Sequence, residues 1–186
     1  MNTKKLILAI LFSIAMISTA SAEIKQVTMR VEGMTWNFWA YGVEQHLGRQ
    51  SGVQKVQVSL IDGKVEITPK TDGHIDPIQL LKATYDSGVS VAEMNMIARG
   101  KIVKNASGEI ALQTEPSQSF TLMQNDLSRQ LETMAGSGSY VTIKGLLYQK
   151  QKGQKKQSLP SSLTVTIIEI QQKEWSGSSL YWFRYW

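Results

Sequence analysis

The most informative absence in the sequence is cysteine, which occurs at none of the 186 positions. Without cysteine the chain forms no disulfide, offers no thiolate to a metal ion or a substrate, and has no site for lipid attachment behind an export signal. An exported protein of this composition is expected to be held together by core packing alone.

The chain also lacks an apolar run of the ~20 residues that a membrane-spanning helix needs. A shorter apolar stretch, 6–17, follows Lys4 and Lys5 and leads into Ala20-Ser21-Ala22. Charged, apolar and small residues follow one another in this order in secretory signal peptides. We therefore expect residues 1–22 to be cleaved off and the mature protein to be periplasmic or secreted; a membrane anchor is the alternative.

A strong net charge and recognisable catalytic motifs are absent as well. The formal charge is +5, and it falls to +3 without Lys4 and Lys5, which is too small to require a nucleic-acid partner. The sequence contains no thiol nucleophile, no glycine-rich phosphate loop and no serine with a recognisable base. We therefore expect a protein that is not an enzyme and does not bind nucleic acid.

The first pattern that is present is an alternation of short strands and helices. Residues 24–32 alternate between apolar and polar side chains, which indicates a half-buried strand, and residues 40–47 follow helical spacing. Asp62-Gly63 predicts a hairpin between two further strands, Asp76-Pro77 the start of a second helix, and 89–96 a fourth strand. The predicted fold is α+β, a ferredoxin-like βαββαβ sandwich with both helices on one face of the sheet.

The loop between the first strand and the first helix reads Gly33-Met34-Thr35-Trp36-Asn37-Phe38-Trp39. Together with the apolar register of 40–47 and of 52–67, it resembles heavy-metal-associated domains, the fold of copper chaperones. In that family the loop reads GMTCxxC, and its two thiolates bind a soft metal ion such as Cu(I). Here Trp36 and Trp39 occupy both cysteine positions, and indole offers only an N–H donor and a π face. The resemblance therefore locates a metal site but leaves it without competent ligands.

Two interpretations of these tryptophans are open. In one, the loop persists as an apolar cap or docking patch; in the other, Trp36 and Trp39 stand in for cysteines that a relative or parent sequence carries. Two of the five tryptophans lie at the ligand positions, which favours replacement over chance. The resemblance implies a protein of metal binding, transport or resistance with a metal-transport protein as its partner, although this chain itself is expected to bind metal weakly at the loop.

The second half of the sequence has a different pattern. Short strands are predicted at 97–104, 109–114 and 119–123, a helix at 126–134, and two more strands at 140–149 and 163–171. Three strands, one helix and two strands is the order of a small OB-type barrel. We therefore expect a heavy-metal-associated-like domain at 23–92, an OB-like domain at 93–173 and an aromatic tail at 174–186.

A second metal site is predicted at the end of the sheet remote from Trp36. Met94 and Met96 lie two residues apart and so share one face of the fourth strand, and the topology brings His46 and His74 to the same end. Thioether and imidazole ligands suit Cu(I) or Ag(I). The alternative is that both methionines belong to the core and both imidazoles face water.

Two further segments are unusual in composition. Lysines at 150, 152, 155 and 156 form a basic run, Lys150–Lys156, which is either a solvated hairpin tip or a surface for anionic lipid or glycan. The tail Trp175–Trp186 carries three tryptophans and two tyrosines and has no periodicity. The alternative function is therefore a periplasmic interaction module that binds no metal and uses the Trp36 loop and this tail.

Overall fold

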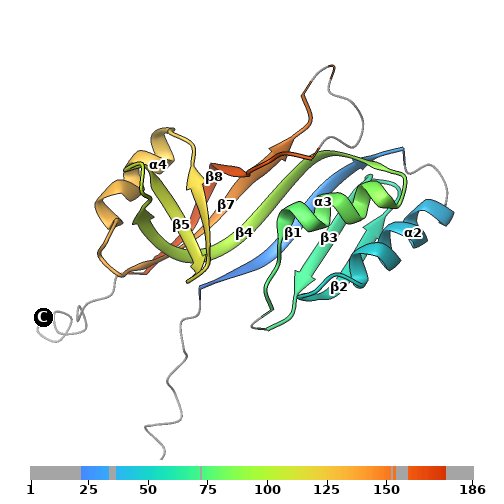
Figure 1. The fold of residues 1–186 in the computed structure, drawn as a ribbon, viewed down its shortest axis with the longest axis horizontal. Helices are drawn as coiled ribbons and strands as arrows, with labels where there is room; N and C mark the ends of the chain where they lie inside the picture. The colour runs from blue at the N-terminus through green and yellow to red at the C-terminus, as the bar shows by residue number, and fades with distance from the viewer. Residues whose placement is uncertain (1–21, 34–36, 72, 152, 154–158, 175–186) are drawn as a thin grey trace, which may run out of the picture.

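The structure is a computed structural model that describes residues 22–33, 37–71, 73–151, 153 and 159–174. Its elements, shown in Figure 1, are β1 (Glu23–Glu32), α2 (Asn37–Gly48), β2 (Val53–Ser59), β3 (Lys64–Pro69), α3 (Pro77–Asp86), β4 (Ser90–Lys104), β5 (Ile110–Glu115), β6 (Gln118–Leu122), α4 (Asp126–Leu131), the 3-10 turn Glu132–Met134, β7 (Tyr140–Gln149) and β8 (Thr164–Glu174). No helix in these ranges is long and apolar enough to cross a membrane.

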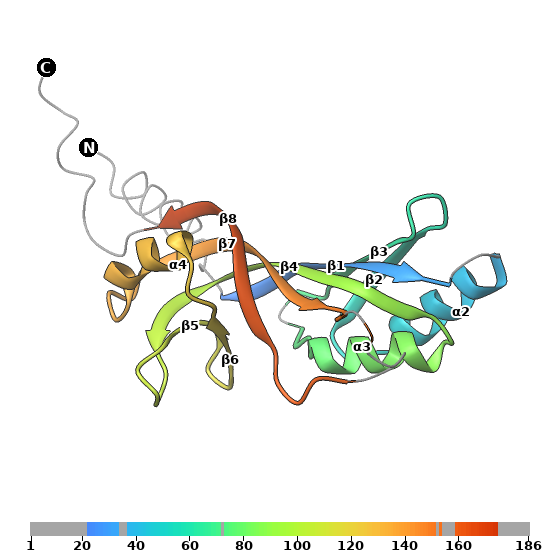
Figure 2. The same cartoon turned by 90° about the horizontal axis from the view of Figure 1, so that it is seen from above.

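The first part of the structure is an antiparallel sheet in the order β2-β3-β1-β4. Helices α2 and α3 lie on the same face of this sheet, as Figure 2 shows. Val27, Met29 and Val31, every second residue of β1, are buried, as expected for a strand with one face against a core. The predicted order of strands and helices in residues 24–96 is confirmed.

Helix α3 begins and ends where its sequence signals predict. The Asp76 side chain accepts a hydrogen bond from the backbone N–H of Ile78 at 2.9 Å, and Pro77 occupies the first helical turn, where a missing N–H costs nothing. Gly88 follows the helix with a φ of +88°, a backbone conformation that glycine adopts without the steric cost of a side chain. Asp76 and Gly88 thus fix the length of the helix that carries Tyr85 into the core.

Strand β4 joins two segments that the sequence predicts as neighbouring strands. The sequence predicts a strand at 89–96 that runs directly into a strand at 97–104, with a domain boundary between residues 92 and 93, and β4 runs from Ser90 to Lys104 without interruption. The physical reason lies at Gly100, where an added Cβ would overlap the backbone carbonyl oxygen of Gln113 in β5. This glycine allows two strands to approach closely and does not end the strand. The two parts of the molecule therefore share β4, with no linker between them.

The second part of the structure is a closed β-barrel. Its strands follow the order β4-β5-β6-β8-β7, and β7 returns to pair with β4. Strands β6 and β8 are parallel, while the other neighbours are antiparallel. The predicted helix at 126–134 is present as α4, whose last turn tightens into the 3-10 turn. Figure 1 shows α4 and α2 at opposite ends of the molecule.

A single buried cluster runs through both parts of the described structure. At the junction, the Tyr85 hydroxyl of α3 donates a hydrogen bond to the Tyr148 hydroxyl of β7 at 3.1 Å, and both side chains are buried. Burial, and then the hydrogen bond to Tyr148, raise the pKa of the Tyr85 phenol well above its ordinary value. The sandwich and the barrel are thus packed against each other through side chains as well as through β4.

Candidate functional site

In the loop that resembles a metal site, the structure describes Gly33 and the residues from Asn37 onward. Gly33 closes β1 with a φ of +88°, and α2 starts at Asn37. Residues 34–36 lie outside the described residues, so the prediction for Trp36 is not tested. Trp39, at the second predicted ligand position, is in the first turn of α2 and is half-buried against the core.

The Trp39 indole packs against the turn between α3 and β4. A Cβ added to Gly88 would lie 2.6 Å from Cζ3 of Trp39, which is closer than real carbon atoms approach. The indole therefore fills the space over Gly88, and the ring is fixed by the glycine that also ends α3. At this position the side chain acts as a packing group between two helices.

The residues described at this loop do not fit a soft metal ion. Trp39 offers an N–H donor and no lone pair to a metal, and soft metals such as Cu(I) select sulfur ligands. Within the described ranges, no group of three or more His, Cys, Asp or Glu side chains is arranged to hold a metal ion. The chemistry that the loop offers is apolar and aromatic contact.

Three exposed apolar side chains lie on α2 and on the β2–β3 turn, and we call Phe38, Tyr41 and Ile61, together with Trp39, the α2 end. Phe38 is 73% exposed, Tyr41 63% and Ile61 98%, and the Phe38 and Trp39 rings meet edge to face with centroids 5.5 Å apart. The β2–β3 turn that carries Ile61 is tied to the end of β1, because the Val31 N–H donates to the Gly63 carbonyl at 2.8 Å. The β2–β3 turn therefore lies beside the end of β1, and the contact of Trp39 with Gly88 places the α3–β4 turn beside the start of α2.

The second predicted metal site is split between the core and the surface. Met94 and Met96 share one face of β4, as predicted, but both are fully buried in the hydrophobic core, at 0% and 1% exposure. His46 and His74 are exposed, and His74 Nδ1 lies 3.0 Å from Glu115 Oε2. A metal ion would have to enter a packed core to reach the two thioethers. The methionines thus belong to the core and the imidazoles face water, which is the alternative to the Met/His metal site.

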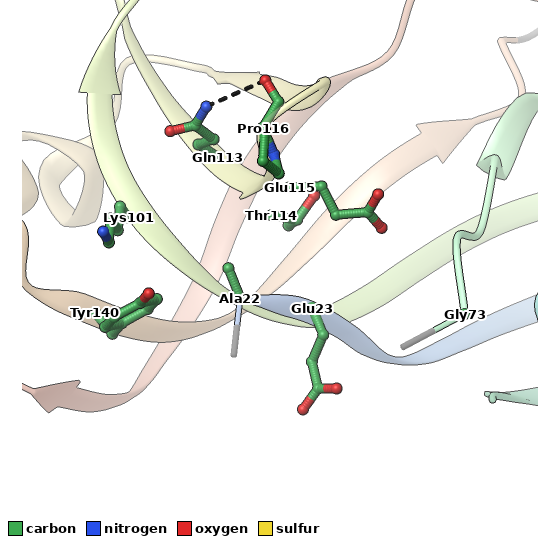
Figure 3. A pocket seen from close by; sticks show the side chains of 9 residues that line it. All are labelled: Ala22, Glu23, Gly73, Lys101, Gln113, Thr114, Glu115, Pro116 and Tyr140. Atoms are coloured by element: carbon green, nitrogen blue, oxygen red, sulfur yellow. Dashed lines mark hydrogen bonds between the residues drawn. The ribbon is translucent and has the colours of Figure 1, made fainter. Parts of the chain in front are cut away.

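The structure contains a cavity that the sequence does not predict. It has a volume of about 590 Å³ and lies where the sandwich meets the barrel, as Figure 3 shows. We call it the junction cavity; its lining is Glu23, Gly73, Lys101, Gln113, Thr114, Glu115, Pro116 and Tyr140, together with Ala22, the last residue of the segment that we expect to be cleaved off. These residues come from the start of β1, the loop before α3, β4, the β5–β6 hairpin and the start of β7. No short motif marks them, so only the fold brings them together.

Tyr140 forms the aromatic wall of the junction cavity. The Arg99 guanidinium carbon lies 4.4 Å from the centre of the Tyr140 ring, and Lys101 Nζ lies 5.1 Å from it. Both distances are within the range of attractive cation–π contacts. Arg99 is buried although it is charged and lies behind the lining, so the cavity wall here presents the Lys101 ammonium beside the Tyr140 ring.

The rim opposite Tyr140 is tied to the sandwich by two polar contacts. Besides the pairing of His74 with Glu115, the Gln118 side-chain amide donates to the Ile75 carbonyl at 2.7 Å. These contacts join the loop before α3 to the β5–β6 hairpin. The cavity therefore has a fixed wall on each side.

Three chains of known structure match this chain in part, and two of them are metal-binding proteins by their descriptions. A CopZ metallochaperone is 28% identical over 36% of this chain and 98% of its own, with a TM-score of 0.34. A protein from Bacillus anthracis str. Ames, which is described as a copper-ion-binding protein, is 25% identical over 39% of this chain and 99% of its own length, with a TM-score of 0.33. No protein-family model and no curated protein matches the chain. At these TM-scores the likenesses do not establish the family.

The basic run Lys150–Lys156 starts beside Glu32, the last residue of β1, at the end of the sheet that carries the Trp36 loop. Lys150 Nζ lies 2.9 Å from Glu32 Oε2, and the Lys150 N–H donates to the Ala92 carbonyl at 2.9 Å. The lysines at 152, 155 and 156 lie outside the described residues. The first residue of the run is therefore held to the end of β1 by an ion pair, and its predicted role at an anionic surface is not tested.

Proposed function

We propose that the chain is an exported protein of the heavy-metal-associated type that serves in metal binding, transport or resistance, and that its metal loop is disabled by Trp36 and Trp39. The proposal includes cleavage after residue 22, a periplasmic or secreted location, and a metal-transport protein as the partner. Catalysis is not part of it. The one observation that carries it is the position of Trp39 within an otherwise intact loop scaffold.

The secondary-structure elements on both sides of the loop support this proposal. A metal loop of this type needs a strand that ends at the loop, a helix that starts after it, and neighbouring turns that shield it. Here β1 ends at Glu32, α2 starts at Asn37, and the Gly63 and Gly88 turns lie beside them. The loop thus keeps its surroundings and differs in the side chains that would hold the metal.

We propose a ferredoxin-like sandwich fused through β4 to an OB-type barrel as the architecture. The βαββαβ order with the sheet order β2-β3-β1-β4 supports the first part. Five strands in the closed order β4-β5-β6-β8-β7, with a helix between the third and fourth, support the second. In this architecture the barrel holds the sandwich rigidly, because the two share a strand.

The proposal is tested by titrating Cu(I) into the full-length protein in competition with a chelator. We expect weak binding by the chain as written and binding that is tighter by several orders of magnitude for Trp36→Cys with Trp39→Cys, because two thiolates then meet at the loop. Trp36→Ser with Trp39→Ser is the matched control, since it removes both indoles and adds no thiolate. If the cysteine variant bound Cu(I) no better than the serine variant, the loop would resemble a metal site in fold only.

The exposure of the α2 end favours a second candidate function, a docking module for a partner protein. Phe38 and Tyr41 lie on the surface beside Trp39, where a metal loop of this type would meet its partner, and exposed apolar groups in a cluster mark interaction surfaces. This function needs no metal. Loss of partner binding in Phe38→Ser with Tyr41→Ser, both exposed side chains, would support it, and loss of partner binding on addition of a chelator alone would contradict it.

A further inference from the structure

We propose that the junction cavity is the docking site of the aromatic tail of the same chain, residues 175–186. The proposal concerns a contact within the molecule and does not depend on metal binding at the Trp36 loop. It combines the lining of the cavity, the position from which the tail departs and the composition of the tail.

The tail departs beside a residue that lines the cavity. Strand β8 ends at Glu174, and its last partner in β7 is Tyr140, the aromatic wall of the cavity. Twelve residues follow Glu174 in the sequence, and an extended chain covers ~3.3 Å per residue. The tail therefore reaches every part of the cavity without any rearrangement of the described strands.

The composition of the tail calls for an apolar and aromatic partner. Six of its twelve residues are aromatic: Trp175, Tyr181, Trp182, Phe183, Tyr185 and Trp186. Burying such side chains is favourable by ~25 cal/mol for each Å² of apolar surface removed from water. The segment Ser176–Ser179 between the first aromatic residue and the rest contains only Ser and Gly, which allows the chain to reverse direction after β8.

The cavity offers complementary groups in a suitable volume. Its volume of about 590 Å³ is in the range of pockets that enclose small ligands, ~300–1,000 Å³. The Tyr140 ring and the Pro116 ring give apolar contact, and the cations of Arg99 and Lys101 already lie over an aromatic face. An incoming indole would extend this stack. The Gln113 side chain at the lip supplies a carbonyl oxygen that accepts from an indole N–H (Figure 3).

The first test uses the fluorescence of the tail. Trp36→Phe with Trp39→Phe leaves only tryptophans 175, 182 and 186 in the full chain, so acrylamide quenching then reports on the tail alone. In this background we expect Tyr140→Ser to raise the quenching constant at least twofold, because the tail loses its aromatic wall. Tyr41→Ser, an exposed tyrosine at the opposite end of the molecule, is the control and should leave it unchanged. Equal quenching in all three proteins would overturn the proposal.

The second test stays informative if Tyr140→Ser fails to fold. Because the chain has no cysteine, a disulfide between Gln113→Cys in the cavity and Ser179→Cys in the tail can be detected without background. We expect an intramolecular bond in most molecules under mild oxidation, and several-fold less bonding when Thr133→Cys, an exposed position shortly before β7, replaces Gln113→Cys. Equal yields from both pairs, or a covalent dimer in place of the closed monomer, would refute docking within the chain.

Discussion

At the scale of single residues, the Trp39–Gly88 contact explains how an indole fits a position that the resemblance assigns to cysteine. The ring lies over a turn that has no side chain, and Gly88 also requires a positive φ. Glycine is a common residue just after the end of a helix, but the sequence gives no sign of the ring above Gly88. A packing partner that is 49 positions away along the chain carries no local signal.

This contact gives a prediction for Gly88→Ala. The added Cβ meets both an unfavourable backbone conformation, which costs ~1–2 kcal/mol, and a ring at 2.6 Å, for which overpacking costs ~1–3 kcal/mol more. Gly108→Ala is the matched control, because its φ is +81° and no atom lies within 4 Å of the added Cβ. Urea unfolding should show the larger loss for Gly88→Ala, and the excess should disappear in a Trp39→Ala background. Equal losses at both glycines would contradict the packing role of Trp39.

Tyr85 predicts how stability changes at alkaline pH. Burial raises the pKa of this phenol above the ~10 of an unfolded chain, so the folded state keeps a proton that the unfolded state has lost. The stabilising contribution is complete below pH ~10 and is lost as the pH rises beyond it. Tyr85→Phe should therefore lose less stability between pH 9 and pH 11 than the parent does. Parallel losses in the two proteins, measured by urea unfolding at each pH, would argue against this assignment.

At the scale of elements, alternation and turn residues predict most strands and helices, because each signal is local. Residues 140–149 alternate and form β7 over the same range, and Asp62-Gly63 does lie in the turn between β2 and β3. The close approach of β4 to β5 is not predictable in this way, because Gly100 has the same local signature in a bulge, a break or a close strand contact. Only the position of Gln113 distinguishes these cases. The junction cavity cannot be predicted from local patterns either, because its lining comes from five segments that are far apart in the sequence.

The role of Gly100 predicts opposite effects of alanine at two glycines. Gly100→Ala places a Cβ against the Gln113 carbonyl and should cost ~1–3 kcal/mol of stability. Gly42→Ala lies within α2 with no atom within 4 Å of the new Cβ, and it should stabilise the protein by up to ~1 kcal/mol through helix propensity. Thermal melts of the two variants decide the matter. A neutral Gly100→Ala would mean that β4 and β5 separate without cost.

At the scale of the whole molecule, shared β4, the buried cluster and the Tyr85–Tyr148 contact join the two predicted domains, and we expect them to unfold together. The buried cluster of the described residues consists of apolar side chains from both parts of the structure, so we expect the chain to fold without a metal ion. This differs from small metal domains that fold only when the metal is bound.

We therefore predict a single calorimetric unfolding transition whose midpoint does not change when a strong chelator is added. The calorimetric and van't Hoff enthalpies should agree, as they do for two-state unfolding. Two resolved transitions would show that the sandwich and the barrel unfold separately. A midpoint lowered by the chelator would reveal a structural metal.

The central proposal is that the elements on both sides of the loop after β1 would bring two thiolates together if cysteine stood at positions 36 and 39. Copper K-edge X-ray absorption of the Trp36→Cys, Trp39→Cys variant loaded with one equivalent of Cu(I) measures the ligands directly. The account predicts two sulfur neighbours around each copper ion in a monomeric protein. A first shell of nitrogen and oxygen, or copper bound through sulfur only in a cross-linked dimer, would contradict it.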